Sequence, residues 1–303
     1  MSIRFDGRVA IVTGAGNGLG RSHALGLAAR GAKVVVNDLG GARDGAGGSP
    51  EAARKVVEEI KAMGGEAIAN GANVADEAAV NAMVAETLSK WGRIDVLIAN
   101  AGILRDKTFA KMDMADFRTV LDVHLVGSAI CAKAVWETMR TQNYGRIVFT
   151  SSSSGLYGNF GQANYGAAKS AMVGLMNVLH LEGEKFNIHV NTLAPTAATR
   201  MTEELLPKEA LEVMTPESIT PGVLYLVSEN GPSRVILDAG AGGFARTYVL
   251  ETEGVTLTGA DLTPEKVAEN FDAISNSPMH AMPNAFSQTH KFVGAALKAR
   301  SGA

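Results

Sequence analysis

The chain has 303 residues, of which 46% are hydrophobic and 19% are charged, a balance typical of folded globular proteins. Its net charge of −3, from 28 basic and 31 acidic residues, argues against a nucleic-acid partner, which would require a basic face. No run approaches the roughly 18 apolar residues of a membrane span, so we expect no membrane segment. The single cysteine, Cys131, excludes a disulfide within the chain.

Neither end of the sequence carries a recognisable targeting signal. The first residues, MSIRFDGRVAIVTG, lack the layout of a signal peptide, and the last residues, KARSGA, are not a peroxisomal Ser-Lys-Leu signal. One unpaired cysteine is also compatible with a reducing compartment. We therefore expect a cytoplasmic protein.

Short apolar runs alternate with longer segments of helical periodicity along most of the chain. Such runs lack polar alternation when helices cover both faces of a sheet. The alternation predicts an α/β fold with a doubly wound, Rossmann-like parallel sheet of about seven strands. The expected strands are Val9–Thr13, Lys33–Asn37, Ala67–Asn70, Ile94–Ala99, Arg146–Ser151, His189–Leu193 and Val235–Asp238.

The pattern weakens after Gly243. The remaining residues contain three prolines, with one helix expected near Pro264–Ile274 and another near His290–Lys298. We expect residues 1–243 to form a dinucleotide-binding and catalytic domain. Residues 244–303 are expected to form a C-terminal extension packed on that domain.

The segment TGAGNGLG follows the first predicted strand directly. Its glycines, Gly14, Gly18 and Gly20, fit the spacing G-x-x-x-G-x-G, whereas Leu19 breaks the fingerprint G-x-G-x-x-G. Glycines permit a tight turn and let the backbone, here including Asn17 and Leu19, approach a pyrophosphate at a helix N-terminus. The turn predicts a dinucleotide site, although a purely structural strand-to-helix turn is the alternative.

The second predicted strand ends in Asp38, within VVVNDLGGARDGAGGSP. A carboxylate there can accept hydrogen bonds from the adenosine ribose, and it would repel a 2′-phosphate. We therefore expect NAD as the cofactor in preference to NADP. Arg43 could instead accept a 2′-phosphate, but it lies in a glycine-rich loop that we expect to be mobile. An exposed aspartate that merely ends a strand is the alternative interpretation.

Tyr165 and Lys169 lie four residues apart in NYGAAK and would share one face of a helix. The ordinary pKa of tyrosine, about 10, makes it a poor base near neutral pH, and an adjacent ammonium would lower that pKa. The pair could then act as a general acid/base between an alcohol and a carbonyl, with a serine hydroxyl holding the same oxygen. Tyrosine and lysine at this spacing also occur by chance in many helices.

Together, TGAGNGLG, NAG at Asn100–Gly102 and a serine thirteen residues before YGAAK resemble the short-chain dehydrogenase/reductase family. The resemblance implies that Ser152 anchors the substrate oxygen and that Tyr165 is the acid/base. It also implies that Lys169 activates the tyrosine and holds the nicotinamide ribose. The further cofactor contacts that it implies are Asn73, Val74, Asn100, Gly102 and Pro195.

Two positions depart from the wider family. His124, in DVHLVGS, stands where most members carry an asparagine that aids a proton relay. A histidine could do this through water, or it could be a packed helical residue. Pro195-Thr196 replaces the usual Pro-Gly pair, which alters the expected contacts with the cofactor carboxamide.

Longer stretches, among them RFDGRV, NAGILRD, VHLVGS and YGNFGQANY, resemble one branch of the family over residues 4 to about 298. This branch contains the (3R)-hydroxyacyl-CoA dehydrogenase domains of peroxisomal multifunctional enzymes of type 2. The resemblance implies lipid metabolism, an acyl-CoA substrate and a homo-oligomer, either a dimer or a tetramer. The glycine-rich loop after Asp38 is a feature of this branch, and we expect it to be a lid over the adenosine end.

The substrate leaves alternatives open. A steroid 17β-alcohol or a steroid side-chain acyl-CoA would use the same chemistry, and a catalytically inactive NAD-binding sensor would use none. An acyl-CoA needs cations at the mouth of its cleft, for which Arg105, Lys107 and Arg200 are the candidates. Its acyl chain is expected near Ser152 and Tyr157. The scattered histidines give no metal site.

Overall fold

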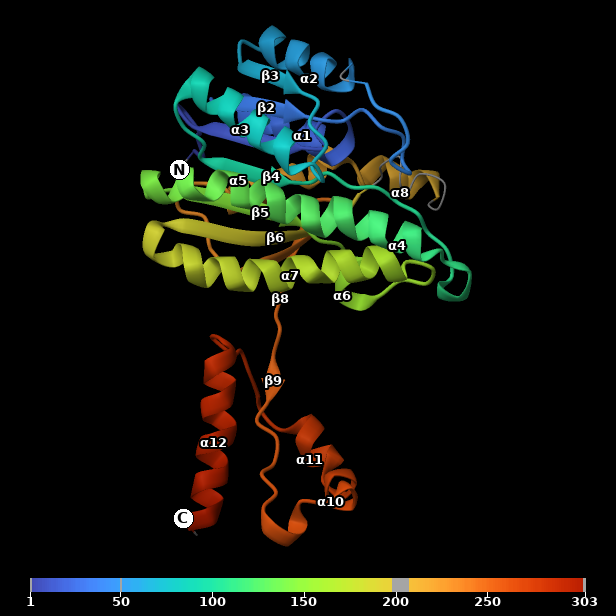
Figure 1. Ribbon diagram of the computed structural model, residues 1–303, viewed down its shortest axis with the longest axis vertical. Coiled ribbons are helices and arrows are strands. Elements are labelled where there is room, and N and C mark those ends of the chain that lie inside the picture. Colours follow the sequence, from blue (N-terminus) through green and yellow to red (C-terminus); the bar gives the residue numbers. More distant parts are fainter. Residues whose placement is uncertain (1, 50, 198–206, 302–303) are drawn as a thin grey trace. The chain divides into compact units, whose positions relative to one another are not determined.

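Figure 1 shows the computed structural model, which describes residues 2–49, 51–197 and 207–301. The chain divides into two compact units, residues 1–246 and residues 247–303. The division falls close to the boundary expected after Gly243. The packing of the second unit on the first stays a prediction, and each unit is described by itself below.

The first unit is built on one eight-stranded sheet with the order β3-β2-β1-β4-β5-β6-β7-β8. The seven predicted strands are present, and all pair in parallel. The strand order reverses between β1 and β4, and open α/β sheets bind their ligands at the carboxyl ends of the strands at such a point. The strands are β1 (Val9–Thr13), β2 (Lys33–Asn37), β3 (Glu66–Asn70), β4 (Val96–Ala99), β5 (Gly145–Thr150), β6 (Ile188–Thr196), β7 (Ile236–Gly240) and β8 (Gly243–Thr247).

The eighth strand, β8, was not predicted. It follows β7 after only two residues, Ala241 and Gly242, whose φ angles are 49° and 78°. Two consecutive residues with positive φ are typical of a tight hairpin turn. The sequence suggested a strand at Val235–Asp238, but the short run GFART gave no clear signal of its own.

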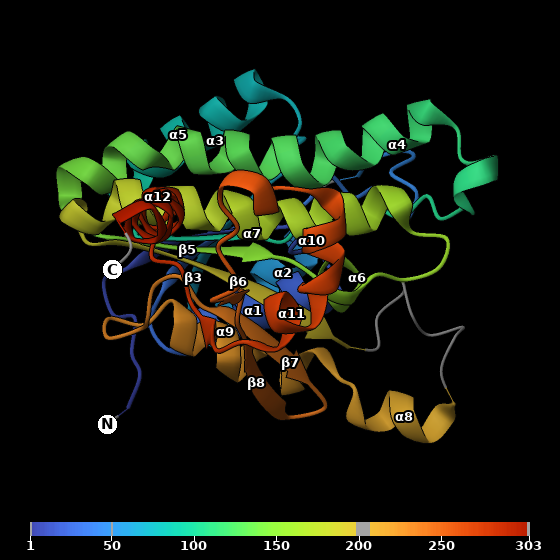
Figure 2. The ribbon, with the colours of Figure 1, turned by 90° about the horizontal axis from the view of Figure 1, so that it is seen from below.

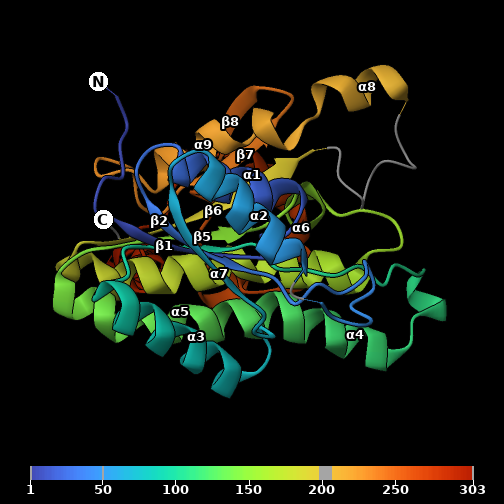
Figure 3. The same ribbon diagram turned by 90° about the horizontal axis from the view of Figure 1, so that it is seen from above.

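Helices cover both faces of the sheet (Figure 3). Alternate residues of each strand enter different cores, so that Ile11 packs with α3, α5 and α7 while Val12 packs with α1, α2 and α9. The helices of this unit are α1 (Gly18–Ala28), α2 (Glu51–Ala62), α3 (Glu77–Trp91), α4 (Met114–Leu121), α5 (Gly127–Gln142), α6 (Ser153–Tyr157), α7 (Ala163–Gly183), α8 (Lys208–Val213) and α9 (Thr220–Leu226).

A π-helical segment, Asp122–Val126, joins α4 and α5 into one continuous helix that lies alongside α7 (Figures 1 and 2). By length and composition alone, Met114–Gln142 could span a membrane, a run that the sequence analysis did not identify. Its inner side buries Cys131, Val135 and Met139 in the core. Core helices of globular proteins commonly meet the same length and composition criteria, so the segment is weak support for a membrane span.

The second unit contains a small antiparallel sheet, three α-helices and a short 3-10 helix at Gly259–Asp261, and none of residues 247–300 is buried. The predicted helix Pro264–Ile274 is present as two short helices that meet at Asn270. The predicted helix near His290–Lys298 is part of a longer one. The elements are β9 (Glu251–Thr252), β10 (Met279–His280), α10 (Pro264–Glu269), α11 (Phe271–Asn276) and α12 (Ala285–Ser301).

Candidate active site

The glycine-rich turn connects β1 to α1 and leaves the first turn of that helix without a cap. Asn17 precedes the helix with an extended backbone, but its side chain makes no capping hydrogen bond. Gly18 has a φ of 52°, in the left-handed region that favours glycine. Leu19 packs against the core and anchors the helix. The N–H groups of the first turn therefore keep the arrangement that binds pyrophosphate.

Close packing within the turn explains Gly14 and Gly20. A β-carbon at Gly20 would lie 2.2 Å from the carbonyl oxygen of Gly14. The Thr13 hydroxyl accepts hydrogen bonds from the N–H groups of Asn100 and Ala101, at 3.0 and 3.1 Å. The Asn100 amide donates in return to the carbonyl oxygens of Thr13 and Gly14. These contacts join the turn to the end of β4, and Thr13 is a site residue that the sequence analysis missed.

Asp38 lies directly after β2 and faces the glycine turn. Its Oδ2 accepts a hydrogen bond from the Gly16 N–H and its Oδ1 accepts one from the Gly40 N–H, both at 2.7 Å. A β-carbon at Gly16 would lie 2.8 Å from Asp38 Oδ2, so only glycine allows this approach. Each carboxylate oxygen keeps accepting capacity for a further hydroxyl group.

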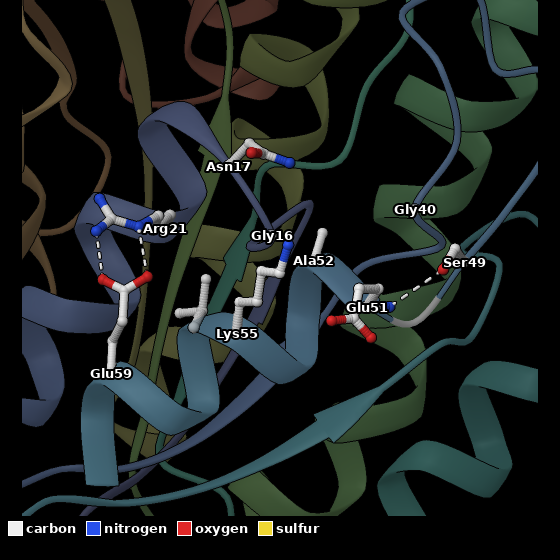
Figure 4. Close-up of a pocket in the computed structure, with 10 residues that line it drawn as sticks. Gly16, Asn17, Arg21, Gly40, Ser49, Glu51, Ala52, Lys55 and Glu59 are labelled. Carbon is white, nitrogen blue, oxygen red and sulfur yellow. Dashed lines mark hydrogen bonds and ion pairs between the residues drawn. The ribbon is translucent and has the colours of Figure 1, made fainter. Parts of the chain in front are cut away.

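A cavity of about 370 Å³ lies beside this acid, between the glycine turn and the start of α2 (Figure 4). Arg21 of α1 and Glu59 of α2 form an ion pair on its wall. Lys55 extends toward Gly16 and makes no hydrogen bond or ion pair with the residues that the structure describes. A cation as well as the acid Asp38 therefore borders this end of the crevice.

The remaining predicted cofactor residues also lie at the carboxyl ends of the strands. Asn73 and Val74 follow β3. Val74 is buried against Gly127, where a β-carbon would lie only 2.8 Å from its Cγ2. Pro195 lies near the end of β6 and pairs in register with Ala239. The structure thus brings these residues to the same edge as the glycine turn, while their contacts with a cofactor stay predictions.

Ser152 and Tyr165 meet at this edge. Ser152 follows β5, is buried, and accepts a hydrogen bond from the Ser154 N–H at 3.2 Å, which caps α6. Tyr165 lies in the first turn of α7, and its side chain is hydrogen-bonded to Ser152. Burial raises the pKa of Tyr165, and the hydrogen bond with Ser152 opposes this only in part.

Lys169 lies one turn further along α7, but its ammonium group is bonded elsewhere. Its Nζ donates to the carbonyl oxygen of Thr150 at 2.6 Å and lies 5.6 Å from the centre of the Tyr165 ring. Burial lowers the pKa of Lys169 to about 7. The predicted lowering of the Tyr165 pKa by this ammonium is therefore wrong for this structure, because burial of the phenol dominates and the two groups are not paired.

His124 lies in the π-helical segment and contacts Tyr165 edge-on, with ring centroids 5.3 Å apart. Its Nε2 lies 2.8 Å from the carbonyl oxygen of Ile103 and 3.0 Å from the N–H of the same residue. A β-carbon at Gly102 would lie 2.2 Å from Cε1 of the ring. Gly102 is therefore glycine because the imidazole covers it, and His124 is part of the site.

Burial is the main cause that lowers the pKa of His124 to about 3, and the charge of Lys169 adds to it. The imidazole is therefore neutral at physiological pH. Its Nδ1 is buried and has no hydrogen-bond partner in the structure. A buried polar atom of this kind normally has a partner, and a water molecule can supply one.

The cations expected to hold a coenzyme A phosphate are already engaged. Arg105 Nη1 and Lys107 Nζ pair with the two carboxylate oxygens of Asp116, at 2.9 and 3.4 Å. Arg105 Nε also donates to the carbonyl oxygen of Asp44. Arg200 lies outside the described residues.

Asn164 is a further residue of the site that the sequence analysis missed. It is fully buried, and its amide donates to the carbonyl oxygen of Arg105 at 3.0 Å. Its Oδ1 accepts a hydrogen bond from the Tyr165 N–H at 2.7 Å. The side chain fixes the start of α7 to the segment after β4, and its position next to Tyr165 was the only signal available in the sequence.

Comparison of the sequence with known proteins places the chain in a family. The model for short chain dehydrogenases matches residues 8–210. The chain is 46% identical to peroxisomal multifunctional enzyme A of Dictyostelium discoideum, over 99% of the chain and 67% of that protein. It is 46% identical to peroxisomal multifunctional enzyme type 2 of Mus musculus, over 95% of the chain but only 39% of that protein. It is 50% identical to a putative short-chain type dehydrogenase/reductase of Mycobacterium tuberculosis, over 82% of the chain and 87% of that protein.

Solved structures agree with this assignment. Full-length peroxisomal multifunctional enzyme type 2 from Drosophila melanogaster superposes with a TM-score of 0.82 at 35% identity, covering 99% of this chain and 51% of that one. A 7α-hydroxysteroid dehydrogenase, complexed with NADH and 7-oxo glycochenodeoxycholic acid, superposes with a TM-score of 0.71 at 30% identity. It covers 79% of this chain and 95% of that one. The fold, the site and the family match together show that the chain belongs to the short chain dehydrogenase family.

Proposed function

We propose that this dehydrogenase uses NAD to oxidise a secondary alcohol, namely the hydroxyl group of a (3R)-3-hydroxyacyl-CoA. The observation that supports the chemistry is the hydrogen-bonded pair of Ser152 and Tyr165 at the carboxyl edge of the sheet. The similarity to peroxisomal multifunctional enzymes over nearly the whole chain supports the substrate class. Since the chain spans only part of those longer proteins, none of their other activities is assigned to it.

The residues around the glycine turn fit NAD. The uncapped first turn of α1 suits the pyrophosphate, and Asp38 suits the ribose hydroxyls. The NADH complex of the related hydroxysteroid dehydrogenase supports the same class of cofactor. Lys55 is the opposing feature, because a cation in the adjacent cavity would favour a 2′-phosphate. Catalytic efficiencies with NAD and NADP test this choice, and a higher efficiency with NADP would contradict it.

Bound NAD would accept the hydride from the alcohol carbon. The chain's own part is to position the alcohol oxygen and to move its proton. The Ser152 hydroxyl holds the oxygen beside Tyr165, whose own oxygen takes up the proton during oxidation and returns it during reduction. Lys169 fixes α7 to the end of β5 through Thr150.

His124 provides a path for that proton. Its neutral ring lies against Tyr165, and its Nδ1 has no partner within the protein. We propose that Nδ1 bonds a water molecule that carries the proton between the site and solvent. The π-helical turn that places the ring is of a type frequently found at functional sites.

The pairing of Arg105 and Lys107 with Asp116 favours a second candidate substrate. A steroid alcohol needs no phosphate-binding cation and requires only an apolar surface. Tyr157 and Phe160 are 70% and 89% exposed, and they lie at and just after the end of α6, the helix that Ser152 caps. Either an acyl chain or a steroid could pack on these rings.

One assay separates the candidates. NAD reduction is measured with (3R)- and (3S)-3-hydroxyacyl-CoA esters and with steroid alcohols. We expect the (3R) esters to be oxidised with the highest efficiency. Better turnover of steroid alcohols would support the second candidate, and turnover of only the (3S) esters would contradict the branch assignment. No turnover of any alcohol would support an inactive sensor, a reading that the presence of Tyr165 and Lys169 disfavours.

We further propose a homo-oligomer in the cytoplasm. Val178 and Leu181 lie three residues apart on α7 and are 54% and 46% exposed, which is the type of apolar surface that a second copy can cover. Light scattering after size-exclusion chromatography measures the oligomeric state, and a monomer would contradict the proposal. Cell fractionation tests the location.

A further inference from the structure

The loop between β2 and α2, residues 39–49, is here called the glycine loop. The sequence led us to expect a mobile segment, but internal hydrogen bonds define its course. The Ala42 N–H donates to the carbonyl oxygen of Ala46 at 2.8 Å, and the Gly45 N–H donates to that of Ala42 at 3.0 Å. The Asp44 side chain accepts from the Ala46 N–H. The loop therefore has a defined turn at its tip, which presents the carbonyl oxygens of Arg43 and Asp44 as acceptors.

That tip is held by the segment that follows β4. The Leu104 N–H donates to the carbonyl oxygen of Arg43 at 3.0 Å, and Arg105 Nε donates to that of Asp44 at 3.0 Å. Gly45 lies against Ile103, since a β-carbon at Gly45 would be 3.2 Å from its Cγ2. Of these contacts only the one from Arg105 comes from a polar side chain, and it is the contact that a substitution can remove.

The two ends of this connection lie at the carboxyl ends of two strands on either side of β1. The glycine loop starts after Asp38, at the end of β2, and its tip is bonded just beyond Asn100–Gly102, at the end of β4. Because β1 lies between β2 and β4 in the sheet, a connection between the ends of those two strands spans the carboxyl end of β1. A dinucleotide held by the turn after β1 would have its adenosine end enclosed by this connection.

Arg105 is fixed by two further contacts. Its Nη1 pairs with Asp116 of α4, and its carbonyl oxygen accepts the buried Asn164 amide next to Tyr165. Lys107 also pairs with Asp116, but no hydrogen bond joins its side chain to the described residues of the glycine loop. The two cations therefore share a partner, while only Arg105 reaches the loop.

We propose that Arg105 is a positioning residue that holds the glycine loop closed over the adenosine end of the cofactor and so slows its release. The proposal rests on the proposed function only in requiring that a dinucleotide binds the crevice. It replaces the expectation that Arg105 binds a coenzyme A phosphate, because Nε and Nη1 of its guanidinium are bonded to Asp44 and Asp116.

The test is the rate of NADH release from the full chain without substrate, followed by stopped-flow fluorescence. Arg105→Lys keeps the charge and a partner for Asp116, but an ammonium cannot also reach Asp44 with the geometry of a guanidinium. Arg105→Ala removes both contacts. We expect both variants to release NADH about tenfold faster, the effect of losing one charge-assisted hydrogen bond. The KM for NAD should rise to a similar extent while kcat stays unchanged or increases.

The matched control is Lys107→Met, which loses the contact with Asp116 and should release NADH at the wild-type rate. Hydrogen exchange of residues 39–49, measured without cofactor, reports how often the glycine loop opens. It should be faster only in the Arg105 variants. The proposal would be overturned if Arg105→Lys released NADH and exchanged its amide hydrogens in residues 39–49 at the rates of the wild type. It would also be overturned if only the KM for the coenzyme A ester were raised. If the wild-type chain bound no NADH, the proposed function would fail, while the exchange measurement would still decide the role of Arg105.

Discussion

Tyr165 and Lys169 both have pKa values displaced toward their uncharged forms. Burial raises the pKa of the phenol, and burial lowers the pKa of the amine to about 7. At neutral pH the tyrosine is therefore protonated and ready to donate, whereas oxidation of an alcohol needs it to accept a proton. The site as it stands without ligands favours the acid role of Tyr165.

Replacement of Tyr165 by phenylalanine keeps the partly buried ring and removes only the group that carries the proton. We expect Tyr165→Phe to lower kcat by about 10²–10⁴-fold, the usual contribution of a general acid or base. NADH binding should persist because the glycine turn is untouched. Near-normal turnover in this variant would remove Tyr165 from the mechanism.

The raised pKa of Tyr165 also predicts how the rate depends on pH. Since the fraction of phenolate increases with pH throughout the neutral range, kcat/KM for alcohol oxidation should rise steadily from pH 7 to pH 9. Reduction of the ketone should change little over the same interval, because the raised pKa keeps the tyrosine protonated. Rate profiles in both directions check this, and an oxidation rate that declines over that interval would contradict it.

His23 gives the protein a built-in sensitivity to acid. It is fully buried on α1, its Nδ1 bonds the Thr220 hydroxyl at 2.9 Å, and burial lowers its pKa to about 3. Between that value and the ordinary pKa of 6.5 only the unfolded chain takes up the proton. The stability contributed by the neutral ring is therefore complete above pH 6.5 and is lost as the pH falls toward 3.

We expect His23→Asn to reduce this loss, because the amide can keep a bond to Thr220 and does not titrate. Between pH 6.5 and pH 5 the wild type should lose about 2 kcal/mol more of its unfolding free energy than the variant, at about 1.4 kcal/mol per pH unit. Urea unfolding at the two pH values measures the difference. Equal losses in both proteins would show that His23 does not titrate on unfolding.

At the scale of elements, the segment after β4 and the π-helical turn form one structure. Gly102 lies under the His124 ring. The backbone N–H and the carbonyl oxygen of Ile103 both lie within hydrogen-bond distance of Nε2 of that ring. Neither element alone would place the imidazole against Tyr165.

Gly102→Ala should therefore impair catalysis although it removes no side chain that takes part in the reaction. Its β-carbon would overlap Cε1 of His124, so the ring must move away from Tyr165. We expect at least a tenfold loss in kcat and a stability loss of about 1–3 kcal/mol, typical of overpacking. Gly71→Ala is the control, since a β-carbon there meets no atom within 4 Å. Equal activity in both variants would contradict the coupling.

The elements themselves were largely predictable, and the departures have physical causes. Continuous apolar runs such as Val34–Val36 identify buried parallel strands because no polar residue interrupts them. β8 was missed because a short edge strand has neither a long apolar run nor strict alternation. The π-helical turn has the same residue pattern as an α-helix, so no sequence signal distinguishes it.

The candidate site was predictable where a residue type carries the chemistry, as for Tyr165 and Asp38. It was not predictable where a residue acts through its neighbours. Thr13 and Asn164 are ordinary polar residues in the sequence, and only the fold shows that each joins two segments. The direction of the pKa shift of Tyr165 could not be predicted either, since a spacing of four residues does not show how deeply the phenol is buried.

At the scale of the whole molecule, the two units differ in how they are stabilised. The first contains every buried side chain of the described residues, and the second contains none. Large apolar side chains of the second unit, such as Phe271, Phe286 and Leu297, are more than half exposed. A unit of this size without a core cannot offset its loss of conformational entropy.

We therefore expect a peptide of residues 247–303 to be unfolded on its own. Circular dichroism of the isolated peptide should show little helix, although α12 alone spans Ala285–Ser301 in the structure. The full chain serves as the control, with α10, α11 and α12 expected to be folded. A cooperative unfolding transition in the isolated peptide would contradict this expectation.

The bonds between Thr13 and the residues Asn100 and Ala101 hold the ends of β1 and β4 together on one side of the cofactor site. One hydroxyl and one amide bind the ends of β1 and β4 into a single block, which cannot open without breaking four hydrogen bonds at once. Any widening must then come from the opposite side, where the glycine loop lies. A change of nucleotide preference should therefore be sought in Asp38 and residues 39–49, while the turn after β1 is left as it is.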